Sequence, residues 1–147
     1  MRHHLFACAL MLATAAPAAG LAQDATVLKT SCAEAPPPAA AAAGEPDLSG
    51  QWDFYIDAGG VPSFGLLSLG RLDGRYAGTL TPVRTATVIV RSLTVNDRKV
   101  QMVVGSREGD VTYDALLSGP GDRMCGIVAY HGGLSYPMVA QRRSQRP

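Results

Sequence analysis

The chain has few of the residues that nucleic-acid and metal sites require. Only 17% of its 147 residues are charged, the formal net charge is +1, and lysine and arginine form no cluster before the last six residues. Such a chain does not favour nucleic acid as a partner. It has three cysteines and three histidines, and one cysteine and two histidines lie in the first eight residues. The others are Cys32, Cys125 and His131, which are too few and too far apart in the sequence for a tetrahedral metal site. We therefore expect no metal and no cofactor.

Patterns typical of catalytic nucleophiles are also missing. The sequence contains no Gly-x-Ser-x-Gly elbow. A Ser-His-Asp triad would have to use Ser135, His131 and Asp114, which no spacing singles out. The other aspartates are scattered over separate segments, which gives no pair for acid–base work. We therefore expect that the protein is not an enzyme.

The first 22 residues have the three parts of a secretory signal peptide. Arg2 supplies the basic start, residues 5–16 form an apolar run, and Gly20 and Ala22 are the small residues before a cleavage point. The run is shorter than the roughly 20 residues that cross a bilayer, and no later segment exceeds it. We expect cleavage near Ala22, a secreted or periplasmic protein, and no stable membrane insertion.

Cleavage would also decide which cysteines remain. Cys8 leaves with the signal, and Cys32 and Cys125 stay in a compartment where disulfides persist. We expect these two to form one intramolecular disulfide. Two separate thiols are the alternative.

The remaining chain divides by composition into a tail and a domain. Residues 23–46 are rich in alanine and proline, which favour an extended chain with little to bury. Residues 47–143 consist of short apolar segments separated by turn residues, and residues 144–147 form a C-terminal tail. We expect a single folded domain over 47–143.

The pattern of that domain predicts an all-β fold. Eight segments are expected to be strands: 50–56, 64–70, 75–81, 86–94, 99–105, 110–117, 123–130 and 134–142. The connections are too short for parallel crossovers, so neighbouring strands must pair antiparallel. One face of each strand is apolar, as in Trp52, Phe54 and Ile56. An eight-stranded meander hides such a face by closing, which predicts an antiparallel up-and-down barrel, with a β-sandwich as the alternative.

The last two strands test this alternation. Met124 and Val128 would share a face opposite Cys125. In the final segment Leu134, Tyr136, Met138 and Ala140 would share the apolar face: all four are expected inside the barrel.

Two motifs resemble those of the calycin barrels, which include lipocalins and avidins. They are Leu48-Ser49-Gly50-Gln51-Trp52 at the first strand and Gly74-Arg75-Tyr76-Ala77-Gly78-Thr79-Leu80 at the third. Over about residues 47–143 the texture is similar to the lipocalin-like barrel domains that precede some secreted α/β-hydrolases. Residues 48–52 are also similar to bacterial inhibitors of secreted metalloproteases, which carry an extended segment before their barrel.

The resemblance implies a closed and an open end. In calycins the first-strand tryptophan plugs one end and an arginine of the last strand packs across it, which here indicates Trp52 and Arg142. Strand parity agrees, since Arg142 shares the apolar face of its strand. With an even number of strands the first and last run antiparallel, so the end of the last strand lies beside the start of the first, where Trp52 stands. Ligands would enter at the other end. Topology brings five residues to that rim: Asp57, Arg84, Arg107, Glu108 and His131.

These observations predict a non-enzymatic barrel that binds a small apolar ligand or a protein partner. One alternative is a protease inhibitor that acts through the tail over residues 23–46. The other is a structural accessory barrel.

Overall fold

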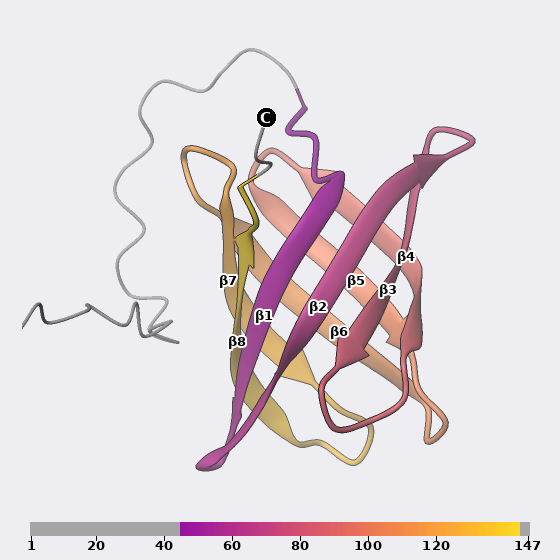
Figure 1. Ribbon diagram of the computed structural model, residues 1–147, viewed down its shortest axis with the longest axis vertical. Coiled ribbons are helices and arrows are strands. Elements are labelled where there is room, and N and C mark those ends of the chain that lie inside the picture. The colour runs from indigo at the N-terminus through magenta and orange to yellow at the C-terminus, as the bar shows by residue number, and fades with distance from the viewer. Residues whose placement is uncertain (1–44, 145–147) are drawn as a thin grey trace, which may run out of the picture.

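The computed structural model describes residues 45–144, in which eight strands form one closed antiparallel barrel (Figure 1). The strands are β1 (Gly50–Ala58), β2 (Val61–Leu72), β3 (Arg75–Pro82), β4 (Val88–Asn96), β5 (Lys99–Gly105), β6 (Asp110–Leu117), β7 (Arg123–Ala129) and β8 (Ser135–Arg142). Each strand pairs with its neighbours in sequence, and β1 also pairs with β8. The predicted up-and-down barrel is therefore confirmed, and the β-sandwich is wrong.

Tight turns set the register of the hairpins. Asp73 and Gly74 join β2 to β3 with φ angles of 50° and 76°, and Gly59 and Gly60 join β1 to β2 with φ angles of 66° and 87°. Two consecutive positive φ angles are those of a type I′ turn, whose twist matches that of the strands it joins. Asp57 stabilises the first turn because its carboxylate accepts a hydrogen bond from the Gly60 amide at 2.9 Å. Such turns allow each strand to pair directly with the next.

The interior of the barrel is filled by one apolar cluster. Side chains at alternate positions point inward, and Trp52, Phe54 and Ile56 of β1 are all buried. In β6 the alternation is complete, with each odd-numbered position from 111 to 117 buried and each even-numbered one exposed. Met124 and Val128 of β7 are buried in the same cluster, which confirms that Cys125 points outward.

The final segment differs from the sequence prediction at its start. Leu134 was expected inside the barrel, but it precedes β8 and its side chain is 57% exposed. The reason is the turn before it, in which the Leu134 carbonyl accepts a hydrogen bond from the Tyr130 amide at 2.8 Å. Tyr136, Met138 and Ala140 follow the predicted face.

Several predictions concern residues outside the described part of the chain. The signal peptide of residues 1–22 and its cleavage near Ala22 lie there, as do Cys32 and residues 23–44 of the tail. The Cys32–Cys125 disulfide therefore stays a prediction. Within residues 45–144 no helix has the length and apolarity needed to cross a membrane.

Candidate functional site

The two ends of the barrel differ, and the end where β1 begins is tightly packed. Trp52 is fully buried, and its indole N–H donates a hydrogen bond to the Leu48 carbonyl at 3.0 Å. The guanidinium carbon of Arg142 lies 4.4 Å from the centroid of the Trp52 ring. Arg142 also donates to the carbonyls of Ser49, Asp47 and Gly121. The structure thus brings Trp52 and Arg142 together, and the Arg142 guanidinium joins two separate backbone segments, residues 47–49 and Gly121.

A second arginine and a tyrosine fasten the chain that leads into β1. The Tyr76 hydroxyl accepts a hydrogen bond from the Leu48 amide and donates one to the Pro46 carbonyl, both at 3.1 Å. Arg71 donates to the same hydroxyl at 2.8 Å, and its guanidinium carbon lies 4.5 Å from the centroid of the Tyr76 ring. Residues 46–48 are therefore tied to the side chains of Trp52 and Tyr76 at this end of the barrel.

The opposite end contains a cavity of about 210 Å³ inside the barrel. Its walls come from the ends of β1, β3, β5 and β7 and the starts of β2, β4, β6 and β8, including Phe54, Met102, Tyr113 and Met138. These four side chains are almost completely buried. The cavity reaches the surface beside the exposed residues Thr85 and Ala86 of the β3–β4 connection.

Few polar groups face this cavity. Ser63, Thr85 and Ser106 stand near its mouth, and Tyr113 supplies a hydroxyl at depth. That hydroxyl donates a hydrogen bond to the Met138 carbonyl at 3.2 Å. Tyr130 lines the wall and packs edge-to-face against Tyr136 with the ring centroids 5.9 Å apart. An apolar chamber with polar groups mainly at the rim suits an apolar molecule with at most one polar end.

Burial raises the pKa of Tyr113 far above its ordinary value of 10.0, and the charge of Arg123 only partly opposes this. In the unfolded chain the phenol ionises near pH 10. The group therefore stabilises the fold fully below about pH 10, and this contribution is lost as the pH rises toward the folded pKa. In an alkaline titration of tyrosinate absorbance, we expect Tyr113 to ionise only when the barrel unfolds. Tyr113→Phe should remove this late phase, whereas Tyr55→Phe, on the outer surface, should retain it. Full ionisation of Tyr113 with an intact β-type circular dichroism spectrum would contradict this prediction.

The five predicted rim residues lie at the connections of this open end, but none of them lines the cavity. Glu108 and His131 contact each other, with 2.9 Å between the carboxylate oxygen and Nε2. Asp57 bonds to its own turn, as described above. Within residues 45–144, Arg84 and Arg107 are exposed and form no ion pair. The rim therefore offers scattered charges outside the mouth rather than one binding group.

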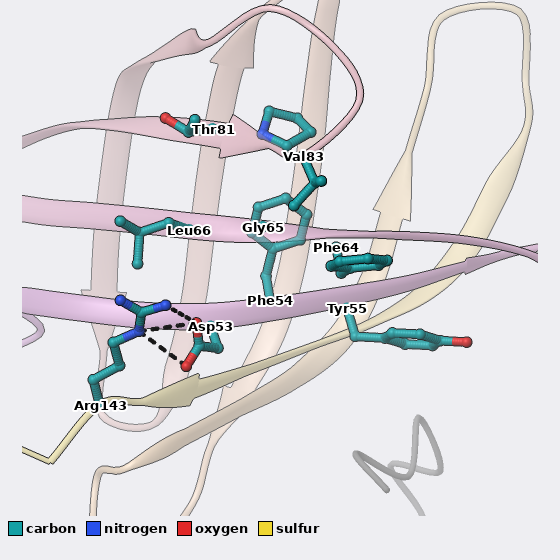
Figure 2. A pocket seen from close by; sticks show the side chains of 10 residues that line it. Asp53, Phe54, Tyr55, Phe64, Gly65, Leu66, Thr81, Val83 and Arg143 are labelled. Carbon is teal, nitrogen blue, oxygen red and sulfur yellow. Dashed lines mark hydrogen bonds and ion pairs between the residues drawn. The ribbon is translucent and has the colours of Figure 1, made fainter.

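A larger hollow of about 770 Å³ lies on the outer surface over β1, β2 and β3 (Figure 2). Figure 2 shows Arg143 paired with Asp53 in this groove, and the rings of Tyr55 and Phe64 in its wall. The Arg143 guanidinium donates to both carboxylate oxygens at 2.6 to 3.0 Å. The groove is open to solvent, so a small molecule would stay largely hydrated there. The interior cavity, which can surround a ligand, is the better candidate site.

Comparisons with known proteins found a similar solved structure but no matching family or curated sequence. No protein-family model matches the chain, and no curated protein sequence matches it. The chain is similar to a solved structure described as a de novo design of a fluorescence-activating beta barrel, with 14% identity and a TM-score of 0.47. The alignment covers 65% of this chain and 93% of that one. The barrel fold rests on the strand order itself.

The cavity residues were visible in the sequence only as apolar faces. Met102, Tyr113 and Met138 stand at inward positions, yet so do Leu117 and Met124, which pack at the closed end. Strand direction separates the two groups, because residues in the open-end half of each strand line the cavity. No group of three or more histidine, cysteine, aspartate or glutamate side chains within residues 45–144 is placed to hold a metal ion.

Proposed function

We propose that the protein is a non-enzymatic barrel that binds one small apolar molecule in the cavity at its open end. The observation that carries this proposal is the cavity of about 210 Å³ lined by buried apolar side chains. An apolar cavity of about 150 Å³ accepts benzene, whereas drug-sized ligands use about 300–1,000 Å³. The volume therefore favours a single ring or a short hydrocarbon chain over a whole fatty acid or retinoid.

The arrangement of the two ends supports the same proposal. Trp52 and Arg142 close one end, so the cavity opens only where the turns of β1–β2, β3–β4, β5–β6 and β7–β8 gather. The lipocalin-like motifs imply entry opposite the tryptophan, which agrees with the position of the cavity. The signal-like residues 1–22 support placing this binding activity in the periplasm or outside the cell.

Toluene is a suitable probe because it is a single ring with one methyl group. We expect toluene to raise the thermal unfolding midpoint of the protein, since a ligand that binds only the folded state stabilises it. Val88→Phe should abolish this effect, because Val88 lines the cavity and a phenyl group would fill it. Ile89→Phe is the matched control, since Ile89 is the next residue and is 60% exposed on the outside.

Fluorescent fatty acids and retinoids form the second arm of the experiment. We expect weaker binding of these larger molecules than of toluene. A midpoint that toluene leaves unchanged, or an equal response of the Val88→Phe and Ile89→Phe variants, would overturn the proposed function.

The protease-inhibitor alternative depends on the tail over residues 23–46, of which only Glu45 and Pro46 are described. It stays a prediction of the sequence, as does the structural accessory barrel. An assay of secreted zinc proteases with and without the tail tests the first of these.

A further inference from the structure

Val139 is an exception among the buried side chains of the barrel. It is 0% exposed, yet it does not belong to the interior cluster that contains the other buried apolar residues. It alternates in β8 with Met138 and Ala140, which point inward. Val139 therefore lies on the outer surface, where a valine would ordinarily remain in contact with water.

The exposure of its neighbours shows that the cover is local. Val139 pairs with Cys125 of β7 on one side and with Tyr55 of β1 on the other. Continuing outward along this row, Cys125 pairs with Leu116 and Tyr55 pairs with Phe64. Leu116 is 52% exposed and Phe64 is 44% exposed, whereas Cys125 and Tyr55 are partly buried. Exposure thus falls from both ends of the row to zero at Val139.

No described segment crosses this face of the barrel. Between Gly50 and Arg142 every connection is a short link at one end of the barrel (Figure 1). Neighbouring side chains of the same sheet can shield a valine from the sides, but a complete cover requires atoms above it. The chain itself offers such a segment in the residues that precede Glu45.

We propose that residues 27–32 dock on the outer row centred on Val139 and that a Cys32–Cys125 disulfide holds them there. Val27 and Leu28 are the bulky apolar residues of the predicted tail and would cover Val139. Cys125 points outward directly beside Val139, so a bond to Cys32 would hold the segment on this face and keep Val27 and Leu28 within reach of Val139.

The length of the chain permits this placement. Arg142 bonds the carbonyls of both Asp47 and Gly121, so the chain enters β1 close to the start of β7. Cys125 is only four positions beyond Gly121. The 14 residues between Cys32 and Asp47 can span up to about 45 Å when extended, which exceeds the distance along four strand residues, about 13 Å.

The disulfide forms by exchange with an oxidised disulfide such as glutathione disulfide. The Cys32 and Cys125 thiols together give up two protons and two electrons, one sulfur–sulfur bond forms between them, and the glutathione disulfide is reduced to two thiols. The docked segment would then cover β8 next to the seam where β8 meets β1. The docked tail would thereby stabilise the pairing of β8 with β1 that closes the barrel.

Trypsin cleavage at Lys29 tests the docking, because no other lysine or arginine lies between Arg2 and Arg71. In the full chain oxidised with glutathione, we expect native protein to be cleaved slowly at Lys29. Cys32→Ser should accelerate this cleavage about tenfold or more, since proteolysis follows the population of the open form. Val139→Thr keeps the β-branched shape, leaves the disulfide intact and should accelerate cleavage severalfold. Ile89→Thr, at an exposed outer position of β4, is the matched control and should have no effect.

Peptide mapping and molecular mass complete the experiment. After denaturation, tryptic peptides 30–71 and 124–142 should appear linked by a disulfide. A bond from Cys125 to Cys8, or none, would overturn the proposal. Equal cleavage at Lys29 in the oxidised wild-type protein and in the Cys32→Ser and Val139→Thr variants would also overturn it. A dimeric mass in solution that Val139→Thr converts to a monomeric one would instead identify a second copy as the cover.

Discussion

Gly126→Ala should destabilise the barrel by about 3 kcal/mol or more, because the added methyl group has no space between β6 and β7. A Cβ atom at Gly126 would collide with the Asp114 carbonyl oxygen, and would lie 2.5 Å from the Ala115 Cα and 2.7 Å from its Cβ. Two of these three atoms belong to the backbone, so relief requires the strands to separate. Chemical denaturation followed by circular dichroism measures the loss.

Gly70→Ala is the matched control for this prediction. Gly70 also lies within a strand, but a Cβ atom there would meet no atom within 4 Å, and its φ angle is not positive. We expect this variant to retain the wild-type stability or to gain slightly, since alanine restricts the unfolded chain. If both variants unfold at the same denaturant concentration, the close approach of β6 and β7 at Gly126 is wrong.

Arg142→Ala is expected to have the second largest effect, a loss of about 2–4 kcal/mol of folding free energy. The substitution removes the cation over Trp52 and leaves the carbonyls of Ser49, Asp47 and Gly121 without their donor. The emission of the only tryptophan should shift to longer wavelength, because water gains access to Trp52. Denaturant titration with tryptophan fluorescence measures both changes.

Arg143→Ala is the neighbouring comparison. Arg143 pairs with Asp53 on the outer surface, where both side chains are about half exposed and solvent weakens the ion pair. We expect this variant to unfold near the wild-type midpoint with unchanged emission. Equal midpoints for the two arginine variants would falsify the role of Arg142 at the closed end.

Much of the fold could be predicted because its signals are local. Gly59-Gly60 and Asp73-Gly74 mark the first two hairpins, and strict alternation in residues 110–117 identifies the buried face of one strand. Trp52 and Arg142 could be related because strand parity and an even strand number together fix which ends meet. Leu134 was misplaced because the alternation of the last segment continues into a turn, where backbone hydrogen bonding rather than side-chain pattern decides the conformation.

The candidate site was less accessible to sequence reasoning. Whether the barrel holds a cavity depends on how much empty volume remains between side chains such as Met102, Tyr113 and Met138. The pattern of polar and apolar positions in a sequence does not determine that volume. Topology placed the predicted rim residues at the end that contains the cavity, but Asp57 bonds to its own turn, and Glu108 and His131 contact each other. Arg84 and Arg107 are exposed and do not line the cavity. Likewise, the burial of Val139 on an outer position breaks the alternation on which the prediction relied.

The pairing of β1 with β8 has a consequence for how the protein is made. Ser49 and Arg142, which meet where β1 pairs with β8, are 93 positions apart in the sequence. All the other strand pairs of the barrel join strands that are consecutive in the sequence. During synthesis the early hairpins can form in order, but β1 has an unpaired edge until the last strand emerges. A chain that is cut short before residue 135 would keep two open edges, each able to add a strand from another molecule. Premature termination should therefore produce aggregates rather than a smaller barrel, and quality control of this protein would depend on its final eight-residue strand.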